Sequence, residues 1–269
     1  MRKILLSVCL LVCLVALTFA AWKLYGHYRI YQDGREEYEE MKDYIGKNES
    51  ADGKDSQNDR DNRKGKKQCP ITVDFEKLKK INPDVVGWIH IPDTAIDYPI
   101  VQAKDNKTYL HKTFKGKDSH IGAIFLDALC KPDFNSFNSI IYGHNLKNGE
   151  MFGHLKKLYD VEYNSKADYK KHPIVWIITP EAAEEYEIFA FREISAGRDK
   201  EVFTTEIPDS KERRVFFDHQ IRESQKDTGI CPSENRRMIT LSTCTSRTRE
   251  GRFIVQAISI RQDAKLSGE

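Results

Sequence analysis

Residues 238–260 read MITLSTCTSRTREGRFIVQAISI, two apolar runs joined by a short polar stretch. Met238–Thr243 and Phe253–Ile260 are rich in β-branched and aromatic residues, which is typical of strands. Two strands joined by so short a connection predict an antiparallel pair. In that pair Cys244 ends the first strand and Arg252 begins the second. We therefore expect them to face each other across the ladder, at about 5 Å between Cα atoms.

The pairing of the Cys244 thiol with the Arg252 guanidinium suits nucleophilic catalysis. The positive charge favours the thiolate form of Cys244, and the same cation can hold the oxyanion of an acyl-transfer reaction. The alternative interpretation is a buried structural cysteine near a surface arginine. Arg247 and Arg249 lie in the connection and compete with Arg252 for the role. Arg252 is preferred because it directly precedes the apolar strand.

A candidate proton carrier lies at the end of another apolar run, in IIYGHN at residues 140–145. This strand leads into a loop at His144, and catalytic groups are often found on such loops. A histidine near a cysteine can move the proton that nucleophilic catalysis requires. The chain has eight histidines, and a single histidine is more often structural. His154 is the nearest rival, but it falls in a predicted helix, Met151–Leu158.

The rest of the chain alternates short apolar runs with turn residues. We expect strands at Val86–Ile91, Ile96–Val101, Ala123–Leu126, Ser139–Tyr142, Ile174–Ile178 and Tyr186–Phe191. We expect helices at Arg35–Ile45, Asp74–Asn82, Met151–Leu158 and Lys211–Gln225. Many short strands and few helices indicate a mostly antiparallel barrel or sandwich.

These segments together resemble a known family. Residues 240–244, TLSTC, are similar to the TLxTC signature of sortases, and Arg252 stands where that family has its essential arginine. Residues 142–145, YGHN, resemble the block around the family's catalytic histidine. Further blocks are similar to class B sortases in order and spacing: residues 75–82, 87–89, 96–102, 109–110, 124–127, 151–158 and 211–225. The resemblance covers roughly residues 74–260.

The resemblance implies a mostly β fold: an eight-stranded sortase-type barrel with N-terminal helices and an additional helix before the hairpin. It also implies the reaction. Cys244 would attack a Thr–Gly or Thr–Asn bond in the C-terminal sorting signal of a secreted protein, and His144 would protonate the leaving amine. An amine of a lipid-linked peptidoglycan precursor would then take the acyl group, with Arg252 stabilising the oxyanion.

By position, five further residues match those that line the substrate groove of the family. They are Asn106, Leu110, Tyr142, Ser242 and Thr243. Alternative interpretations remain for three of them, namely a loop cap for Asn106 and core packing for Leu110 and Tyr142.

The N-terminus predicts a membrane anchor. Residues 4–22 carry no charge and approach the ~20 apolar residues that a helix needs to cross a bilayer. Arg2 and Lys3 favour a cytoplasmic N-terminus, although cleavage after the weak site at 18–20 stays open. We therefore expect a cytoplasmic end at 1–3, a single-pass anchor at 4–22, a helical and polar linker at 23–69, and an extracellular catalytic domain at 70–269.

Composition excludes other functions. The 43 basic and 41 acidic residues give a net charge of +2, without the basic face that nucleic acid requires. The six cysteines lack CxxC spacing, so a zinc or thioredoxin-like motif is not expected. A disulfide among Cys69, Cys130 and Cys231 stays open. The acidic residues at 181–187 lack the alternating ligands of a calcium loop, so we expect no metal and no cofactor.

Three alternatives to a sortase that modifies the cell wall remain. A hydrolytic cysteine peptidase would use Cys244 and His144 but pass the acyl group to water. A pilin-type polymerase would use a protein lysine as the acceptor. A non-enzymatic wall-binding module would have no use for a combined cysteine, histidine and arginine.

Overall fold

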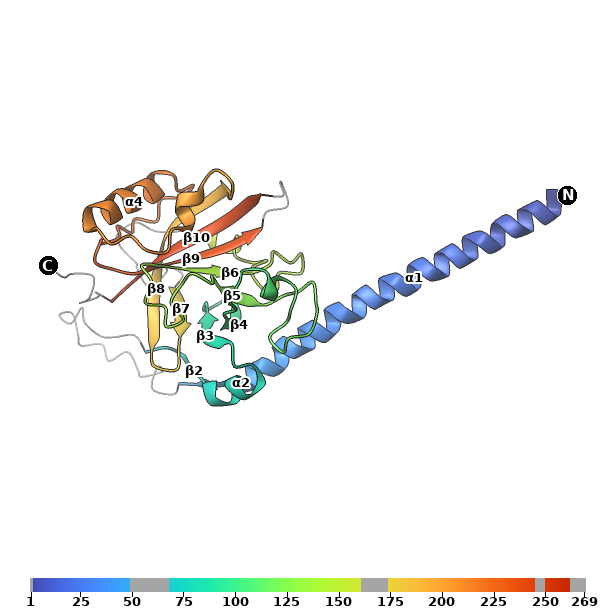
Figure 1. Ribbon diagram of the computed structural model, residues 1–269, viewed down its shortest axis with the longest axis horizontal. Helices are drawn as coiled ribbons and strands as arrows, with labels where there is room; N and C mark the ends of the chain where they lie inside the picture. Colours follow the sequence, from blue (N-terminus) through green and yellow to red (C-terminus); the bar gives the residue numbers. More distant parts are fainter. Residues whose placement is uncertain (1, 49–67, 161–173, 245–249, 262–269) are drawn as a thin grey trace.

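The C-terminal hairpin forms as predicted, from β9 (Met238–Cys244) and β10 (Gly251–Ser259). These strands belong to a closed barrel of eight strands in the order β10-β8-β7-β3-β4-β5-β6-β9 (Figure 1). The computed structural model describes residues 2–48, 68–160, 174–244 and 250–261. The prediction of a mostly β, eight-stranded barrel is confirmed.

The other barrel strands are β3 (Val85–His90), β4 (Asp97–Val101), β5 (Ile124–Leu126), β6 (Asn138–Tyr142), β7 (Ile174–Ile178) and β8 (Ala183–Ser195). Neighbouring strands are antiparallel except for β4–β5 and β6–β9, which are parallel. A separate pair, β1 (Ile45–Lys47) with β2 (Ile71–Val73), was not predicted. Three residues are too few to show a period of two.

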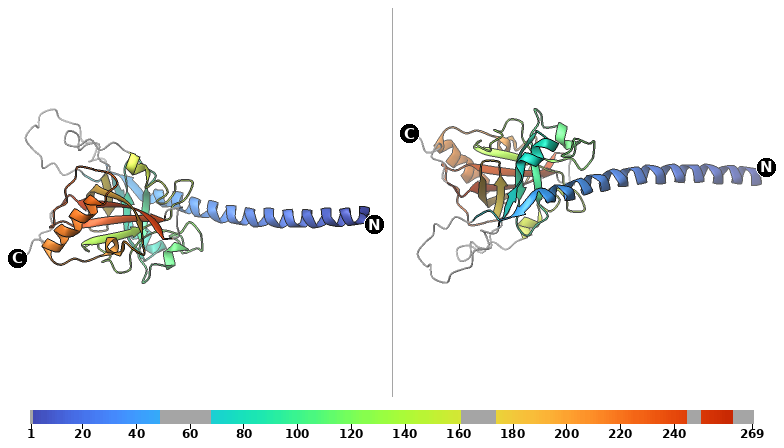
Figure 2. Two further views of the ribbon diagram at one scale, coloured as in Figure 1. Left: turned by 90° about the horizontal axis from the view of Figure 1, so that it is seen from above. Right: turned by 90° about the horizontal axis from the view of Figure 1, so that it is seen from below.

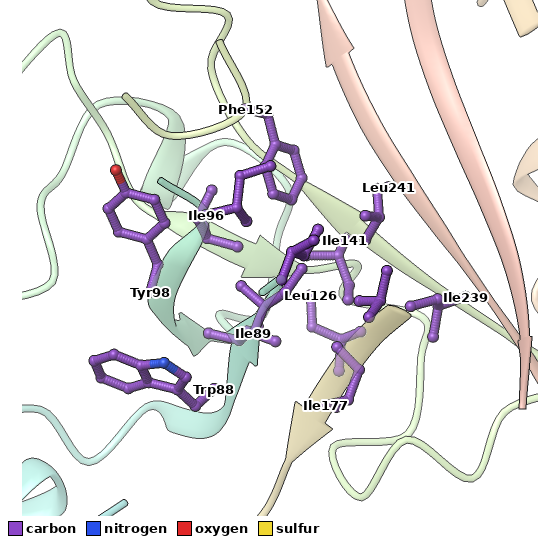
Figure 3. Packing of buried hydrophobic residues seen from close by; sticks show 14 of the residues in the cluster. Trp88, Ile89, Ile96, Tyr98, Leu126, Ile141, Phe152, Ile177, Ile239 and Leu241 are labelled. Atoms are coloured by element: carbon purple, nitrogen blue, oxygen red, sulfur yellow. The ribbon is translucent and has the colours of Figure 1, made fainter. Parts of the chain in front are cut away.

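The barrel interior is filled by large aliphatic and aromatic side chains (Figure 3). In β9, Ile239 and Leu241 pack in this core, whereas Thr240 between them donates a hydrogen bond to Asn138 Oδ1 at 2.8 Å. Burial of one such apolar side chain stabilises the fold by about 1.5–3 kcal/mol. A slip of one residue would move this whole set to the other face, so the core fixes the register of the hairpin.

In the described part of the chain, four α-helices accompany the barrel. The longest, α1 (Arg2–Met41), projects away from the barrel (Figure 1 and Figure 2). Next come α2 (Phe75–Ile81) and the short α3 (Lys157–Asp160). The last, α4 (Ser210–Arg222), lies before β9 as predicted, and its Phe217 packs with Phe137 and Phe189 outside the main core. Short 3₁₀ helices occupy Lys42–Tyr44, Thr108–Leu110 and Lys200–Phe203.

The two ends of α1 lie in different environments. Its N-terminal part carries exposed large apolar side chains from Ile4 to Ile30. By length and composition it is the one helix in the described part of the chain that suits a membrane crossing. Its C-terminal part packs on the barrel, where Tyr38 and Met41 are buried in the main core. The helix therefore continues without a break past residue 22, where the anchor was expected to end.

The predicted helix at Met151–Leu158 is wrong for most of its length. Residues 152–156 form turns, and regular helix begins only at Lys157. Gly149 and Met151 adopt positive φ values of 88° and 53°, a region that residues in an α-helix do not occupy. The apolar spacing of Phe152, Leu155 and Leu158 reflects burial of two turn residues and one residue of α3 rather than one helical face.

Candidate active site

The predicted pairing of Cys244 with Arg252 is present in the antiparallel register of β9 and β10. The two residues face each other in the β9–β10 ladder, with Cys244 as the last residue of β9. On its other side Arg252 faces Ile194 of β8. The Arg252 side chain is half-buried, and its Nη1 donates to the carbonyl of Gly251 at 2.9 Å. The Cys244 side chain, Arg247 and Arg249 lie outside the described residues.

The parallel pairing of β6 with β9 brings His144 to the same end of the barrel as Cys244 and Arg252. Tyr142 is the register partner of Ser242, and Gly143 N donates to the carbonyl of Ser242 at 3.2 Å. Parallel strands run in the same direction, so two residues further along β6 correspond to two residues further along β9. The backbone of His144 therefore leaves the sheet beside that of Cys244.

Backbone groups from another loop hold the His144 ring. Its Nε2 lies 2.7 Å from the carbonyl oxygen of Leu110. A carbonyl only accepts hydrogen bonds, so Nε2 carries the proton, and Nδ1 is the nitrogen left to exchange a proton with a reactant. Gly122 also lies close to the ring, because a Cβ there would lie 2.8 Å from His144 Cδ2 and 3.0 Å from Nε2. Gly122 also has a φ of 64°, which glycine tolerates best.

Tyr142 lies on the side of the sheet that faces Arg252. The buried Asp127 carboxylate accepts from Tyr142 Oη at 2.9 Å and from Asn106 Nδ2 at 2.8 Å. Burial first, and then the charge of Asp127, raise the pKa of Tyr142 well above its usual range, while the charge of Arg252 acts in the opposite direction. Tyr142 is therefore a neutral phenol whose hydroxyl is held by the Asp127 carboxylate.

This site belongs to a chain with clear relatives. A family model described as the sortase domain matches residues 89–259. Sortase B of Listeria monocytogenes is 35% identical over 188 residues, which cover 69% of this chain and 74% of that protein. The chain belongs to the sortase family. Because its relatives are sortases of class B, this sortase is a class B enzyme, a cysteine transpeptidase.

Solved structures of class B sortases share the fold of this sortase. The X-ray structure of Clostridium perfringens sortase B matches with a TM-score of 0.62 at 30% identity, covering 70% of this chain and 100% of that one. A Staphylococcus aureus sortase B–substrate complex matches with a TM-score of 0.60 at 28% identity, covering 70% and 84% of the two chains. The match to the family model, residues 89–259, includes β9, β10 and the His144 loop.

The five residues predicted to line the groove of this sortase occupy different environments. Asn106 is half-buried, and its Oδ1 accepts from the backbone N–H of Ala128 at 2.8 Å. The side chain of Leu110 packs against the main core, while its carbonyl binds His144. Ser242 and Thr243 are buried, and within the described part of the chain their hydroxyls have no hydrogen-bond partner. Contact of any of the five with substrate stays a prediction.

The other cysteines of the sortase are free thiols: Cys9, Cys13, Cys69, Cys130 and Cys231. No disulfide therefore joins Cys69, Cys130 and Cys231, a question that the sequence left open. Burial raises the pKa of Cys130 to about 12 and also raises the pKa of Cys69. Because the thiolate is the nucleophilic form, these two buried thiols are inert.

One of the acidic residues at 181–187 stabilises the barrel. Glu184 of β8 forms an ion pair with Arg237 at 3.3 Å and accepts a hydrogen bond from Ser259. Neighbouring residues along the strand point to opposite faces, so Glu184 and Glu185 do not converge on one point. Across the described ranges, no group of three or more potential metal ligands gathers.

Sequence reasoning missed Asp127 as part of this site. The residue was noticed only within a block similar to class B sortases. Its two hydrogen bonds bring together Asn106, which lies 21 positions earlier in the chain, and Tyr142, which lies 15 positions later. No periodicity signals such a contact, and a lone aspartate after a strand is usually a turn residue.

Proposed function

We propose that this sortase cleaves the C-terminal sorting signal of secreted proteins and joins them to an amine of a lipid-linked peptidoglycan precursor. One observation carries the assignment of its catalytic residues. Three strands, β6, β9 and β10, bring His144, Cys244 and Arg252 to the same end of the barrel. The proposed roles are nucleophile for Cys244, acid/base for His144 and oxyanion stabiliser for Arg252.

In the proposed reaction, the Cys244 thiolate attacks the carbonyl carbon of the Thr–Gly or Thr–Asn bond. The carbonyl oxygen becomes an oxyanion, which the Arg252 guanidinium stabilises. The C–N bond then breaks while Nδ1 of the protonated His144 gives its proton to the leaving amine, producing a thioester. The amine of the acceptor attacks the thioester, gives a proton back to His144 and releases the thiolate.

Incubation of the enzyme with sorting-signal peptides, with and without an amine acceptor, tests this function. We expect a thioester intermediate and an amide product whose yield rises with amine concentration. A free carboxylate as the sole product, even at saturating amine, would indicate a hydrolytic cysteine peptidase. Transfer to a folded protein lysine in preference to a peptidoglycan-type amine would indicate a pilin polymerase.

We further propose that α1 anchors the enzyme with its barrel outside the cell. The exposed apolar side chains from Ile4 to Ile30 support a membrane span, and Arg2 and Lys3 support a cytoplasmic N-terminus. Removal of residues 1–22 should move the enzyme from the membrane to the soluble fraction without loss of peptide cleavage. Persistent membrane association of this shorter chain would contradict the anchor.

Arg252→Lys should resemble Arg252→Ala more than the wild type. Lysine preserves the charge near Cys244, but it lacks the planar fork with which a guanidinium addresses several acceptors together. Loss of one oxyanion donor commonly costs about 10²–10³-fold in rate, and we expect a loss of this order in acyl-enzyme formation.

The matched controls for Arg252 are Arg247→Ala and Arg249→Ala, measured in the same acylation assay. Both should stay near the wild-type rate. Near-normal acylation by Arg252→Lys would show that charge alone suffices. A larger loss at Arg247 or Arg249 would transfer the role to that residue.

A further inference from the structure

We propose that the last two turns of α1, residues 34–41, position the catalytic histidine, and that Tyr38 is the main positioning residue. The inference rests on the proposed role of His144. It assigns to the N-terminal helix a second role besides the proposed anchoring, because its C-terminal part contacts both the loop that holds the imidazole and the loop that follows His144.

One hydroxyl of α1 makes hydrogen bonds to two points of the first loop. Tyr38 is buried, and its Oη donates to the carbonyl of Gly122 at 2.7 Å. The same oxygen accepts from the backbone N–H of Phe114 at 3.1 Å. Burial raises the pKa of Tyr38 well above its usual range, so the hydroxyl keeps the proton that it donates. The link ties two points of residues 109–123 to the helix.

That loop forms the walls around the His144 ring. Gly122 lies against its Cδ2 and Nε2 atoms, and the carbonyl of Leu110 accepts from Nε2. Ala123 N donates to the carbonyl of Tyr109 at 3.0 Å, so the two walls are joined at the base of the loop. A shift of Gly122 therefore changes both the packing of the imidazole and the hydrogen bond that sets its tautomer.

Glu37, the residue before Tyr38, adds further contacts between α1 and the first loop. Its carboxylate is buried, and Oε1 accepts from the backbone N–H of Lys115 at 2.7 Å. The Lys117 ammonium lies 3.7 Å from Oε2. Burial of a carboxylate is costly unless charges and donors compensate it, and here both come from the loop that holds His144.

The second loop follows His144 directly and also reaches α1. Arg35 forms an ion pair with Glu150 at 3.3 Å, and Met151 N donates to Tyr98 Oη at 3.2 Å. The Tyr98 ring packs edge-on against the ring of Tyr38 at 5.6 Å. The backbone N–H of Phe152 donates a hydrogen bond to the carbonyl of His144 at 3.0 Å. The helix thus contacts both the loop that holds the imidazole and the loop that follows His144.

The test replaces Tyr38 by Phe in the full chain, which keeps the ring packing and removes only the hydroxyl. We expect kcat for peptide cleavage to fall about 3- to 30-fold, less than the ~10²–10⁴-fold that loss of the acid/base group costs. KM should change little. The ¹⁵N resonances of the His144 imidazole should show a reduced share of the tautomer protonated at Nε2. A role confined to stability would lower Tm and leave the tautomer unchanged.

Tyr159→Phe is the matched control, because it removes a hydroxyl that donates to the carbonyl of Gln225 at 3.1 Å rather than to the histidine loop. It should leave kcat and the His144 resonances as in the wild type. Equal effects of Tyr38→Phe and Tyr159→Phe, at equal folded fraction, would overturn the inference.

Glu37 provides a second pair of variants that does not depend on the folding of Tyr38→Phe. The amide oxygen of Glu37→Gln can still accept from Lys115 N, whereas Glu37→Leu cannot. We expect Gln to stay near the wild type and Leu to reproduce the tautomer change. An unperturbed His144 spectrum in both Tyr38→Phe and Glu37→Leu would overturn the inference. Wild-type enzyme that fails to cleave any sorting peptide would instead contradict the proposed function, since the imidazole spectra test the positioning without turnover.

Discussion

Cys244→Ala should reduce both peptide cleavage and transfer to the uncatalysed background while leaving the melting temperature near that of the wild type. The change removes one sulfur at the end of β9 and leaves the strand pairing to β10 intact. Without the thiolate there is no acyl-enzyme, so neither the hydrolytic nor the aminolytic product can form.

The other cysteines serve as internal controls, because each is a thiol that could replace Cys244 as nucleophile. Cys69 and Cys130 are buried with raised pKa values, so they have little nucleophilic character. Cys231 is exposed and within hydrogen-bond distance of Arg214, at 3.5 Å, which makes it the reactive thiol to control for. Mass spectrometry of the enzyme after exposure to a sorting peptide should find the adduct on Cys244 in the wild type. An adduct or turnover that persists in Cys244→Ala would move the nucleophile to another residue.

The hairpin was predictable because its evidence is local. Residues 238–260 contain two apolar runs and a short connection, and the pairing of Arg252 with Cys244 follows from their places at the ends of those runs. The helix at 211–225 was predictable for the same reason, and α4 departs from it by only a few residues at its ends. Boundaries of this kind shift easily with the method of assignment.

The loops around His144 were not predictable, because their order comes from contacts between distant parts of the chain. Tyr38 and Gly122 are 84 positions apart, and Leu110 and His144 are 34 apart. The apolar spacing of residues 151–158 looked helical, yet positive φ values at Gly149 and Met151 turn the chain instead. Periodicity reports which residues are buried, and it cannot distinguish a helical face from a series of packed turns.

His144→Ala should lower the rate of acyl-enzyme formation by about 10²–10⁴-fold, the usual contribution of a general acid/base group. The reason is specific to this geometry. With Nε2 bound to the carbonyl of Leu110, the ring presents Nδ1 as its exchangeable site, and no other histidine leaves the sheet beside β9 within the described ranges. Alanine offers no proton to the departing amine, so the tetrahedral intermediate returns to substrate.

His154→Ala is the matched control for His144, because His154 lies only ten positions further along the chain in the same loop region. Its ring packs over Gly149, and burial, followed by the charge of Lys157, lowers its pKa. We expect this ring to contribute packing, so its loss should lower Tm with little change in turnover per folded molecule. Acylation rates measured at equal folded fraction separate the two histidines. If both variants lose turnover equally, the position beside β9 does not decide the role, and the acid/base group must be sought elsewhere in the site.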